Sequence, residues 1–373
     1  MFRLRQVASA AILSGVCAVA ILGHLDAARA ATFKLLYTFC TLNHCADGAY
    51  PSPESLIIDA KGNLYGTTEA GGVGRIKGGG TVYEFAPGGR ETVLYAFRES
   101  GYLGQEPDGL VMDRKGHLFG TTGTGHGSPC GTAYKILAVQ TKKTRYKFAG
   151  PPNDGCGAQG SLVIDANGNL FGTTSSGGKR DEGIAFEIAK DGTETVLHSF
   201  CAKTVTCADG ASPLGGLIMD KSGNLIGTTE SGGNHLCTYG CGTVFELTPD
   251  GTESVLHAFK GSPNDGWEPV SKLIQGPSGN FYGTTAGGGV MSDRCVINMG
   301  CGIVFKLAPN GDETVRYYFK GRGGGYSPYG GLIEDAAGNL YGTTSYGGSY
   351  TYPCGGGCGT VFEIAPDGTE TIL

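Results

Sequence analysis

The sequence predicts an all-β protein: a six-bladed β-propeller of four-stranded antiparallel blades, closed by the N-terminal strand. Its first basis is the triplet Gly-Thr-Thr, which recurs every 52 to 59 residues, starting at Gly66, Gly120, Gly172, Gly227, Gly283 and Gly342. Its second basis is that each repeat holds four short apolar or alternating segments between turn residues. Four strands in a repeat of this length are typical of propeller blades. A β-solenoid is the alternative, but its coils are usually shorter and lack paired hairpin turns.

Residues 1–30 have the features of a secretory signal peptide. Arg3 and Arg5 precede a mostly apolar segment from Val7 to Leu22, and Ala28-Arg29-Ala30 forms a small-residue cleavage site. We therefore expect cleavage near Ala30 and a secreted, periplasmic or cell-envelope protein. The apolar segment is short for a transmembrane helix, and no later stretch is long and apolar enough, so we expect no membrane span.

The first repeat illustrates the four predicted strands. Leu56 to Ile58 is apolar and is followed by a turn at Asp59 to Asn63, where Asp, Gly and Asn tolerate the positive φ of tight hairpins. The second strand ends in Gly-Thr-Thr at Thr68. The third, Thr81 to Phe85, alternates with period two, as a strand does. The fourth runs from Glu91 to Phe97.

The repeats define the predicted domain organisation. A single propeller spans residues 31–373, with blade repeats at about 54–97, 109–148, 160–200, 215–259, 271–319 and 330–373. Thr32 to Phe39 resembles a fourth strand that has no blade before it, and the sixth repeat ends in a shortened fourth strand at Thr369 to Leu373. We therefore expect residues 32–39 to close the ring.

The motif Gly-Asn-Leu-Tyr-Gly-Thr-Thr at 62–68 is followed by Gly71-Gly72, and Gly-Thr-Val-Phe-Glu occurs at 242–246. Repeated in tandem behind a signal peptide, these motifs resemble the GloVer tandem-repeat family of exported bacterial proteins, over essentially residues 33–373. The resemblance implies a propeller-like protein on the cell exterior, often held there by a C-terminal anchor. This chain departs from that pattern by stopping at Leu373. The family implies no established activity, so no catalytic residue is carried over.

Cysteine usage predicts disulfides. Apart from Cys17 in the signal peptide, the chain has twelve cysteines, an even number in an exported protein. We predict the pairs Cys40–Cys45, Cys130–Cys156, Cys201–Cys207, Cys237–Cys241, Cys295–Cys301 and Cys354–Cys358. The alternative is a metal held by cysteine with His44, His126 or His235. Because the chain lacks Cys-x-x-Cys and the spacings differ between blades, we expect no metal site.

Four aromatic residues in the blade connections are the candidate ligand-binding residues. In an up-and-down blade, the second-third loops share a face with the blade connections, and both sets are long and variable here. Variable loops on a rigid scaffold are common binding sites, and exposed aromatic rings stack on sugars or anchor protein partners. The alternative is that these rings only pack against neighbouring loops. The four candidates are Tyr50, Trp267, Tyr326 and Tyr329.

Other polar motifs favour scaffold roles. His198 and His257 occupy one fourth-strand position in successive repeats, which indicates a structural role. Four repeats share an Asp-Gly turn whose carboxylates could ring a cation, although a duplicated turn is the simpler interpretation; these residues are Asp47, Asp154, Asp209 and Asp265. No nucleophile elbow or phosphate-binding loop is present. We assign no catalytic residue and expect no cofactor.

The predicted function is that of a secreted or cell-envelope binding or scaffold module, acting through a disulfide-pinned loop face on an extracellular glycan or protein. We expect a monomer. A net charge of −6 without a basic run argues against nucleic acid as a partner. Two alternatives stay open: a structural surface protein without a small ligand, and a propeller lyase or hydrolase acting on an extracellular glycan with its acidic residues and His44, His126 or His235.

Overall fold

The computed structural model describes residues 34–52, 55–73, 78–98, 106–123, 129–202, 206–292, 295, 299–349 and 357–373. The predicted signal peptide lies outside these residues. Lys34 to Leu373 form one compact unit. Its described residues are organised as strands with two short 3₁₀ turns, η1 (Asn43–Cys45) and η2 (Arg322–Gly324). None of the helices found in this part of the chain is long and apolar enough to cross a bilayer.

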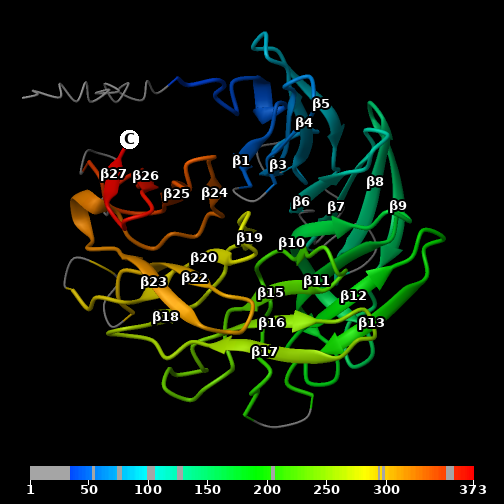
Figure 1. Ribbon diagram of the computed structural model, residues 1–373. Coiled ribbons are helices and arrows are strands. Elements are labelled where there is room, and N and C mark those ends of the chain that lie inside the picture. Colours follow the sequence, from blue (N-terminus) through cyan, green and yellow to red (C-terminus); the bar gives the residue numbers. More distant parts are fainter. Residues whose placement is uncertain are drawn as a thin grey trace, which may run out of the picture. The chain divides into compact units, whose positions relative to one another are not determined.

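The strands form a six-bladed propeller, as predicted, whose antiparallel blades follow one another in chain order (Figure 1). The first three blades contain β1 (Ala49–Pro51), β2 (Ile57–Ile58), β3 (Leu64–Ala70), β4 (Thr81–Phe85) and β5 (Glu91–Ala96); β6 (Pro107–Met112), β7 (Leu118–Thr122), β8 (Thr132–Ala138) and β9 (Thr141–Lys147); and β10 (Gly155–Ile164), β11 (Leu170–Gly177), β12 (Ile184–Ile188) and β13 (Glu194–Ser199).

The last three blades repeat this arrangement. Their strands are β14 (Ile218–Met219), β15 (Leu225–Thr229), β16 (Thr243–Leu247) and β17 (Glu253–Ala258); β19 (Ile274–Gln275), β20 (Phe281–Thr285), β22 (Ile303–Leu307) and β23 (Glu313–Tyr318), with the small pair β18 (Gly266–Trp267) and β21 (Gly287–Gly288); and β24 (Ile333–Glu334), β25 (Leu340–Thr344), β26 (Thr360–Ile364) and β27 (Glu370–Ile372).

The Gly-Thr-Thr motif is explained by the contacts of the second strand. Gly66 lies opposite Tyr83 of the third strand, and a Cβ at Gly66 would come within 2.3 Å of the Tyr83 hydroxyl. Gly227 and Phe245 stand in the same relation, with 2.7 Å to the ring. The glycine therefore makes room for an aromatic ring of its own blade, and any larger residue would displace that ring.

The second threonine of the motif links the second and third strands. Its hydroxyl lies 2.8 to 3.1 Å from a threonine hydroxyl across the sheet in four blades: Thr68–Thr81, Thr122–Thr132, Thr229–Thr243 and Thr344–Thr360. These side chains are buried. Pairing satisfies hydroxyls that would otherwise be costly to bury.

Neighbouring blades are joined by aromatic rings. In the first five blades, the phenylalanine directly after the fourth strand packs against the third-strand aromatic of the next blade, with ring centroids 4.9 to 5.2 Å apart: Phe97–Tyr134, Phe148–Phe186, Phe200–Phe245, Phe259–Phe305 and Phe319–Phe362. All ten rings are buried. Each contact continues the hydrophobic core from one blade into the next.

The N-terminal segment supplies the corresponding contact to the first blade. Phe39 lies 4.8 Å from Tyr83 between ring centroids, and the Tyr37 hydroxyl donates to Asp47 at 2.9 Å. The predicted closing strand itself is not confirmed, because its described residues, 34–39, form no strand. Its first two residues lie outside the described part of the chain.

The blade connections contain more strand structure than the repeats predicted. Ala49 and Pro51 of β1 pair with Ala70 and Thr68 at the end of β3, and Trp267 of β18 pairs with Gly287. In the second and third blades, β6 and β10 combine both parts of this first strand. A register shift interrupts each of them, so sequence periodicity did not reveal their continuity.

Candidate functional site

The blade connections and the second-third loops lie together, and we call the surface they form the loop face. In five blades the backbone N–H of a loop glycine donates to a carbonyl of the preceding connection at 2.7 to 2.9 Å: Gly72 to Cys45, Gly178 to Asp154, Gly233 to Cys207, Gly289 to Asp265 and Gly348 to Arg322. These glycines have positive φ and no room for a Cβ. This repeated geometry thus fixes one end of the second-third loop in these five blades.

Disulfides lie along the loop face. Among the described residues they join the predicted pairs Cys40–Cys45, Cys130–Cys156, Cys201–Cys207, Cys237–Cys241 and Cys295–Cys301. Cys358 is also disulfide-bonded, and its predicted partner, Cys354, lies outside the described residues. Because metal ligation requires a thiolate, the oxidised cysteines are not available as metal ligands.

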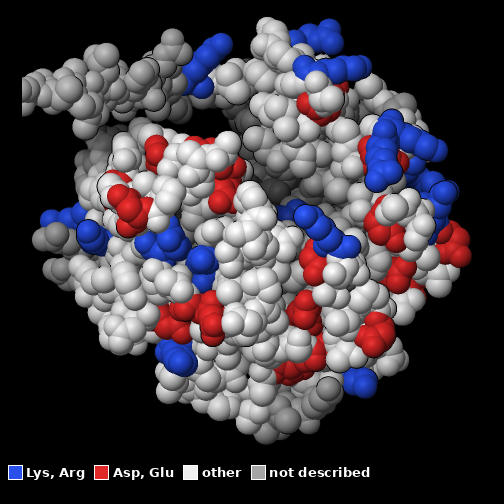
Figure 2. Space-filling view, viewed as in Figure 1, with Lys and Arg blue, Asp and Glu red and all other residues white. Residues whose placement is uncertain are grey.

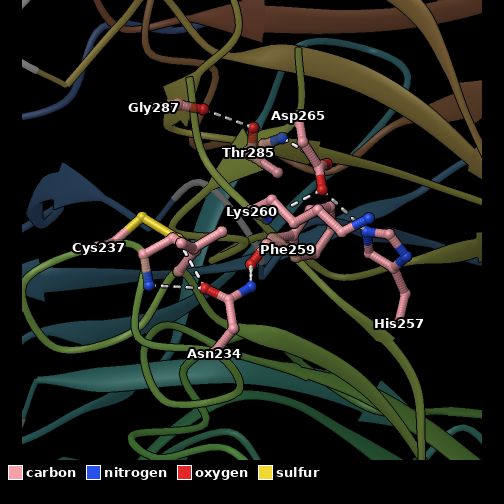
Figure 3. The surroundings of a disulfide bond; sticks show 11 residues. Asn234, Cys237, His257, Phe259, Lys260, Asp265, Thr285 and Gly287 are labelled. Atoms are coloured by element: carbon pink, nitrogen blue, oxygen red, sulfur yellow. Dashed lines mark hydrogen bonds and ion pairs between the residues drawn. A yellow bond between two sulfur atoms is a disulfide. The ribbon is translucent and has the colours of Figure 1, made fainter. Parts of the chain in front are cut away.

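The loop closed by Cys237–Cys241 is also anchored to the strand before the next connection. The Asn234 side-chain amide donates to the Phe259 carbonyl, and its oxygen accepts the Leu236 N–H at 3.0 Å (Figure 3). Phe259 in turn packs on Phe305 of the next blade. The loop is therefore fixed to the junction between the fourth and fifth blades.

The aspartates of the Asp-Gly turns are used by the scaffold. Each accepts hydrogen bonds from its own connection and from a Tyr or His in the segment before that connection: Tyr37–Asp47, Tyr146–Asp154, His198–Asp209 and His257–Asp265, at 2.9 to 3.3 Å. In Figure 3 the Asp265 carboxylate lies between the Lys260 backbone N–H and His257. Because tyrosine takes the same place in two of the four pairs, these histidines have a structural role.

A glutamate from the next blade approaches two of these pairs. His257, Asp265 and Glu313 place their ligand atoms within 4.8 Å of one another. Burial, and then the charge of Asp265, raises the pKa of Glu313 to about 7. Burial and Asp154 likewise raise the pKa of Glu194 to about 7. Because Tyr146 replaces the histidine beside Asp154, the repeated element is a carboxyl pair that favours a bound proton, and no metal is needed to explain it.

The candidate binding site is a cavity of about 570 Å³ on the loop face. It is lined by the connections and loops of the third, fourth and fifth blades, including Trp267, Tyr239 and His235. Three glutamates, Glu182, Glu230 and Glu268, complete its charged lining. Tyr239 lies inside the Cys237–Cys241 loop, and Cys207 of the neighbouring disulfide also contributes to the wall.

Backbone hydrogen bonds hold the three glutamates. The Glu182 carbonyl accepts the Ser212 N–H at 2.9 Å, and the Ser212 carbonyl accepts the Glu230 N–H at 3.0 Å. The Glu268 N–H donates to Cys241 at 3.2 Å. Ser212 and Glu268 both precede a proline and have positive φ, a backbone conformation that costs free energy unless its surroundings enforce it. Hydrogen bonds therefore fix the backbone that carries the three glutamates of the cavity.

The electrostatics of this cavity favour a ligand that carries positive charge or donates hydrogen bonds to carboxylates. Burial, and then the charge of Glu230, raises the pKa of Glu268 to about 7. Burial also raises the pKa values of Glu230 and Glu182. The described residues include no salt bridge from Lys or Arg to any of the three. Donors from a ligand would meet acceptors that the protein leaves largely unused.

The structure brings two of the predicted aromatic residues to this region. Trp267 lines the cavity, and Tyr329 is close enough to Glu268 and Glu230 for their charges to raise its pKa, after burial as the main cause. Tyr326 stacks on Tyr346, with ring centroids 5.2 Å apart. Tyr50 lies on the first blade, in β1, and is 69% exposed. The structure thus does not gather the four residues into one cluster.

The glutamates are the residues that sequence reasoning missed. Glu182 precedes the glycine that opens a third strand, a position occupied by cysteine in four other blades. Glu230 follows Gly-Thr-Thr, and Glu268 precedes a proline. These are three different repeat positions, so a repeat alignment does not group them. His235 lines the same cavity, His44 lies in η1, and His126 lies outside the described residues.

Several solved structures have this fold. Virginiamycin B lyase from Staphylococcus aureus matches with a TM-score of 0.54 and 12% identity, over 86% of this chain and 84% of that chain. A streptogramin B lyase matches with a TM-score of 0.55 and 12% identity, over 88% and 83%. The extracellular domain of a putative hybrid two component system from B. thetaiotaomicron matches with a TM-score of 0.54 and 15% identity, over 90% of this chain and 36% of that chain. At these identities the similarity shows the fold alone.

The comparison with curated proteins finds no similar sequence. The Gloeobacter/Verrucomicrobia repeat, by contrast, matches residues 24–238 and 220–373, which together cover every blade. The chain belongs to the Gloeobacter/Verrucomicrobia repeat family, as the tandem motifs predicted.

Proposed function

We propose that this protein is an exported binding module that holds an extracellular glycan or protein at the loop-face cavity. The observation that carries the proposal is the cavity of about 570 Å³, in which Trp267 lies with three carboxylates that form no salt bridge with any Lys or Arg among the described residues. An aromatic ring beside acceptor groups suits a sugar, whose apolar face stacks on the ring while its hydroxyls donate hydrogen bonds.

Export is supported by the features of residues 1–30 and by the disulfides, which form and persist in oxidising compartments. Similar propellers include an extracellular domain, which fits the same location. Expression of the full chain in a bacterial host tests this part. The exported protein is expected to begin near residue 31, and retention in the cytoplasm with an intact N-terminus would contradict it.

A glycan array with the purified mature chain tests the binding function. Trp267→Ala and the double variant Trp267→Ala/Tyr326→Ala should weaken the binding of any ligand found. Tyr341→Ala should not, because Tyr341 lies in β25 and its hydroxyl donates to Asp335 of the first-second turn of blade six. Circular dichroism and thermal melts check that each variant folds. Unchanged binding by the double variant would remove the loop face as the site. Absence of any glycan or protein ligand would favour a structural surface protein.

Catalysis is a second candidate, favoured by one observation. Glu268, whose pKa is raised to about 7, lines the same cavity as His235, and groups that titrate near neutrality suit general acid–base chemistry. If the protein cleaves a bound glycan, Glu268→Gln should abolish turnover, while binding, although weaker, is still measurable. Glycan recovered intact after prolonged incubation with the wild-type protein would exclude this candidate for that glycan.

A further inference from the structure

A second charged region lies away from the loop face, on blade two. Residues 107–147 carry seven Lys and Arg side chains and two acidic ones, although the whole chain has a net charge of −6. Figure 2 shows basic side chains gathered over the region of β8 and β9, while acidic side chains are more frequent elsewhere on the same view. This blade is therefore cationic within an acidic protein.

The basic residues surround a cavity of about 570 Å³ between the second and third blades. It is formed by the first-second turns of both blades and by the third-fourth turn of blade three. Five cationic side chains line it: Arg114, Lys115, Lys135, Arg145 and Lys190. The acidic residues in the lining are Asp113 and Asp165. The cavity thus has a clear excess of positive charge.

The two aspartates accept hydrogen bonds within their own turns. Asp113 accepts the Lys115 and His117 backbone N–H groups and contacts the His117 ring at 2.8 Å. Asp165 accepts the backbone N–H groups of Asn167 and Asn169. The salt bridges of the described residues are all histidine–aspartate pairs. Among the described residues, the lysines and arginines of this cavity therefore make no salt bridge. The one described carboxylate whose pKa responds to them is Asp191, whose pKa is lowered by hydrogen bonds from Thr193 and then by the charge of Arg145.

Part of the cationic lining is held in place. The Arg145 guanidinium donates to the carbonyls of Ala189 and Lys190 in the next blade, and its Nε is buried without a partner. Lys135 Nζ lies 5.1 Å from the centre of the Phe119 ring. Arg114, Lys115 and Lys190 are exposed around them. Two positioned cations and three exposed ones thus form a site for negative charge.

We propose that this cavity binds an anionic polysaccharide, one that carries carboxylate or sulfate groups along its chain. Lys143 and Lys147 are exposed on β9 and extend the positive charge beyond the cavity, which suits a polymer better than a single anion. Asn167 and His117 also line the cavity and provide groups that can hydrogen-bond sugar hydroxyls. Single-stranded nucleic acid is disfavoured because Phe119, the one Phe, Tyr or Trp among the described residues of the lining, is buried and cannot stack on a base.

The test is affinity electrophoresis of the mature protein in gels containing polygalacturonate or dextran sulfate, with neutral dextran as the blank. The wild-type protein should be retarded by at least one charged polymer, and about 0.5 M NaCl should reverse this, because salt screens exposed charges. Arg114→Gln/Lys115→Gln/Lys190→Gln should weaken retardation by about tenfold through the loss of three contacts.

The matched control is Lys61→Gln/Arg90→Gln/Lys221→Gln, which removes three charges from the same kinds of turn in blades one and four. It should bind as the wild type does. Equal losses in the two variants would show that net charge alone is responsible and would overturn the proposal. No retardation of the wild type by either charged polymer, or tighter binding of single-stranded DNA, would overturn it as well. Trp267→Ala should leave this binding unchanged, so the outcome is independent of the loop-face site.

Discussion

Buried carboxyl groups at the blade junctions make stability depend on pH. Glu91, Glu194 and Glu313 begin equivalent fourth strands, and the pKa of each is raised to about 7 by burial and then by the aspartate of the preceding connection. Between the ordinary value of 4.5 and about 7, the folded chain holds these protons more tightly than the unfolded chain. Their contribution to stability is therefore present below about pH 4.5 and is lost as the pH rises through about 7.

At high pH, ionisation of Glu313 beside Asp265 destabilises one blade junction, and Glu313→Gln should remove this destabilisation. At pH 8 the wild-type carboxylate is ionised beside Asp265, whereas the amide is neutral. After a discount for solvent screening, the free energy of unfolding should rise by an amount on the order of 1 kcal/mol, which corresponds to about 2–4 °C in Tm. At pH 5 the gain should be much smaller. Thermal melts between pH 5 and pH 8 measure both effects, and equal shifts at the two ends would contradict the proton-sharing explanation.

At the scale of single elements, the conformation of a loop on the loop face depends on the disulfide that closes it. The Cys237–Cys241 ring closes a short loop that contains Tyr239 and borders the cavity, and Asn234 ties the same loop to Phe259. The residues inside it have few strand contacts, so the disulfide restricts conformations that backbone pairing does not. Loss of this restriction should affect the cavity more than the blades.

Cys237→Ser/Cys241→Ser should lower the free energy of unfolding by about 2 kcal/mol, from the entropy of a small closed loop. It should also weaken ligand binding at the loop face, with the circular dichroism of the propeller retained. Cys40→Ser/Cys45→Ser is the matched control, because it opens a ring of similar size on blade one. Denaturant unfolding and ligand titration of both variants check this. A similar loss of affinity in the two would mean that the effect is global.

Repeat elements could be predicted because each satisfies a local requirement. Gly66 accommodates Tyr83, and Thr68 pairs with Thr81. The same residue types therefore recur at every repeat position where the same contacts are made. The disulfide pairs could also be proposed, from an even number of closely spaced cysteines. The cavity could not, because Glu182 and Glu230 become neighbours only through the packing of two blades, and single-repeat patterns carry no information about that packing.

At the scale of the whole molecule, one blade junction differs from the others. Five junctions use buried phenylalanines that directly follow a fourth strand, whereas Phe39 is only half-buried and follows described residues that form no strand. Phe39 and Tyr37 nevertheless make the contacts of their counterparts with Tyr83 and Asp47. Side chains, more than backbone pairing, therefore attach the N-terminal segment to blade one.

Deletion of residues 32–39 should lower Tm by several degrees, since the lost ring contact and hydrogen bond together contribute about 1–3 kcal/mol. Deletion of residues 369–373 should cost less, because β27 pairs over three residues and is mostly exposed. Melting curves of the two truncated proteins decide this. The reverse order of stability would assign the closing role to the C-terminal strand.

Binding at the loop-face cavity is most directly tested by the fluorescence of Trp267, the only tryptophan in the chain. Because Trp267 lines the cavity, a ligand seated there changes the polarity around the indole ring, and no other tryptophan obscures the signal. Titration with a glycan or protein that binds the wild type should give a saturable shift in emission. The same titration of Glu230→Gln/Glu268→Gln should require more ligand. A ligand that binds, by calorimetry, without any change in Trp267 emission would place binding elsewhere and contradict the account.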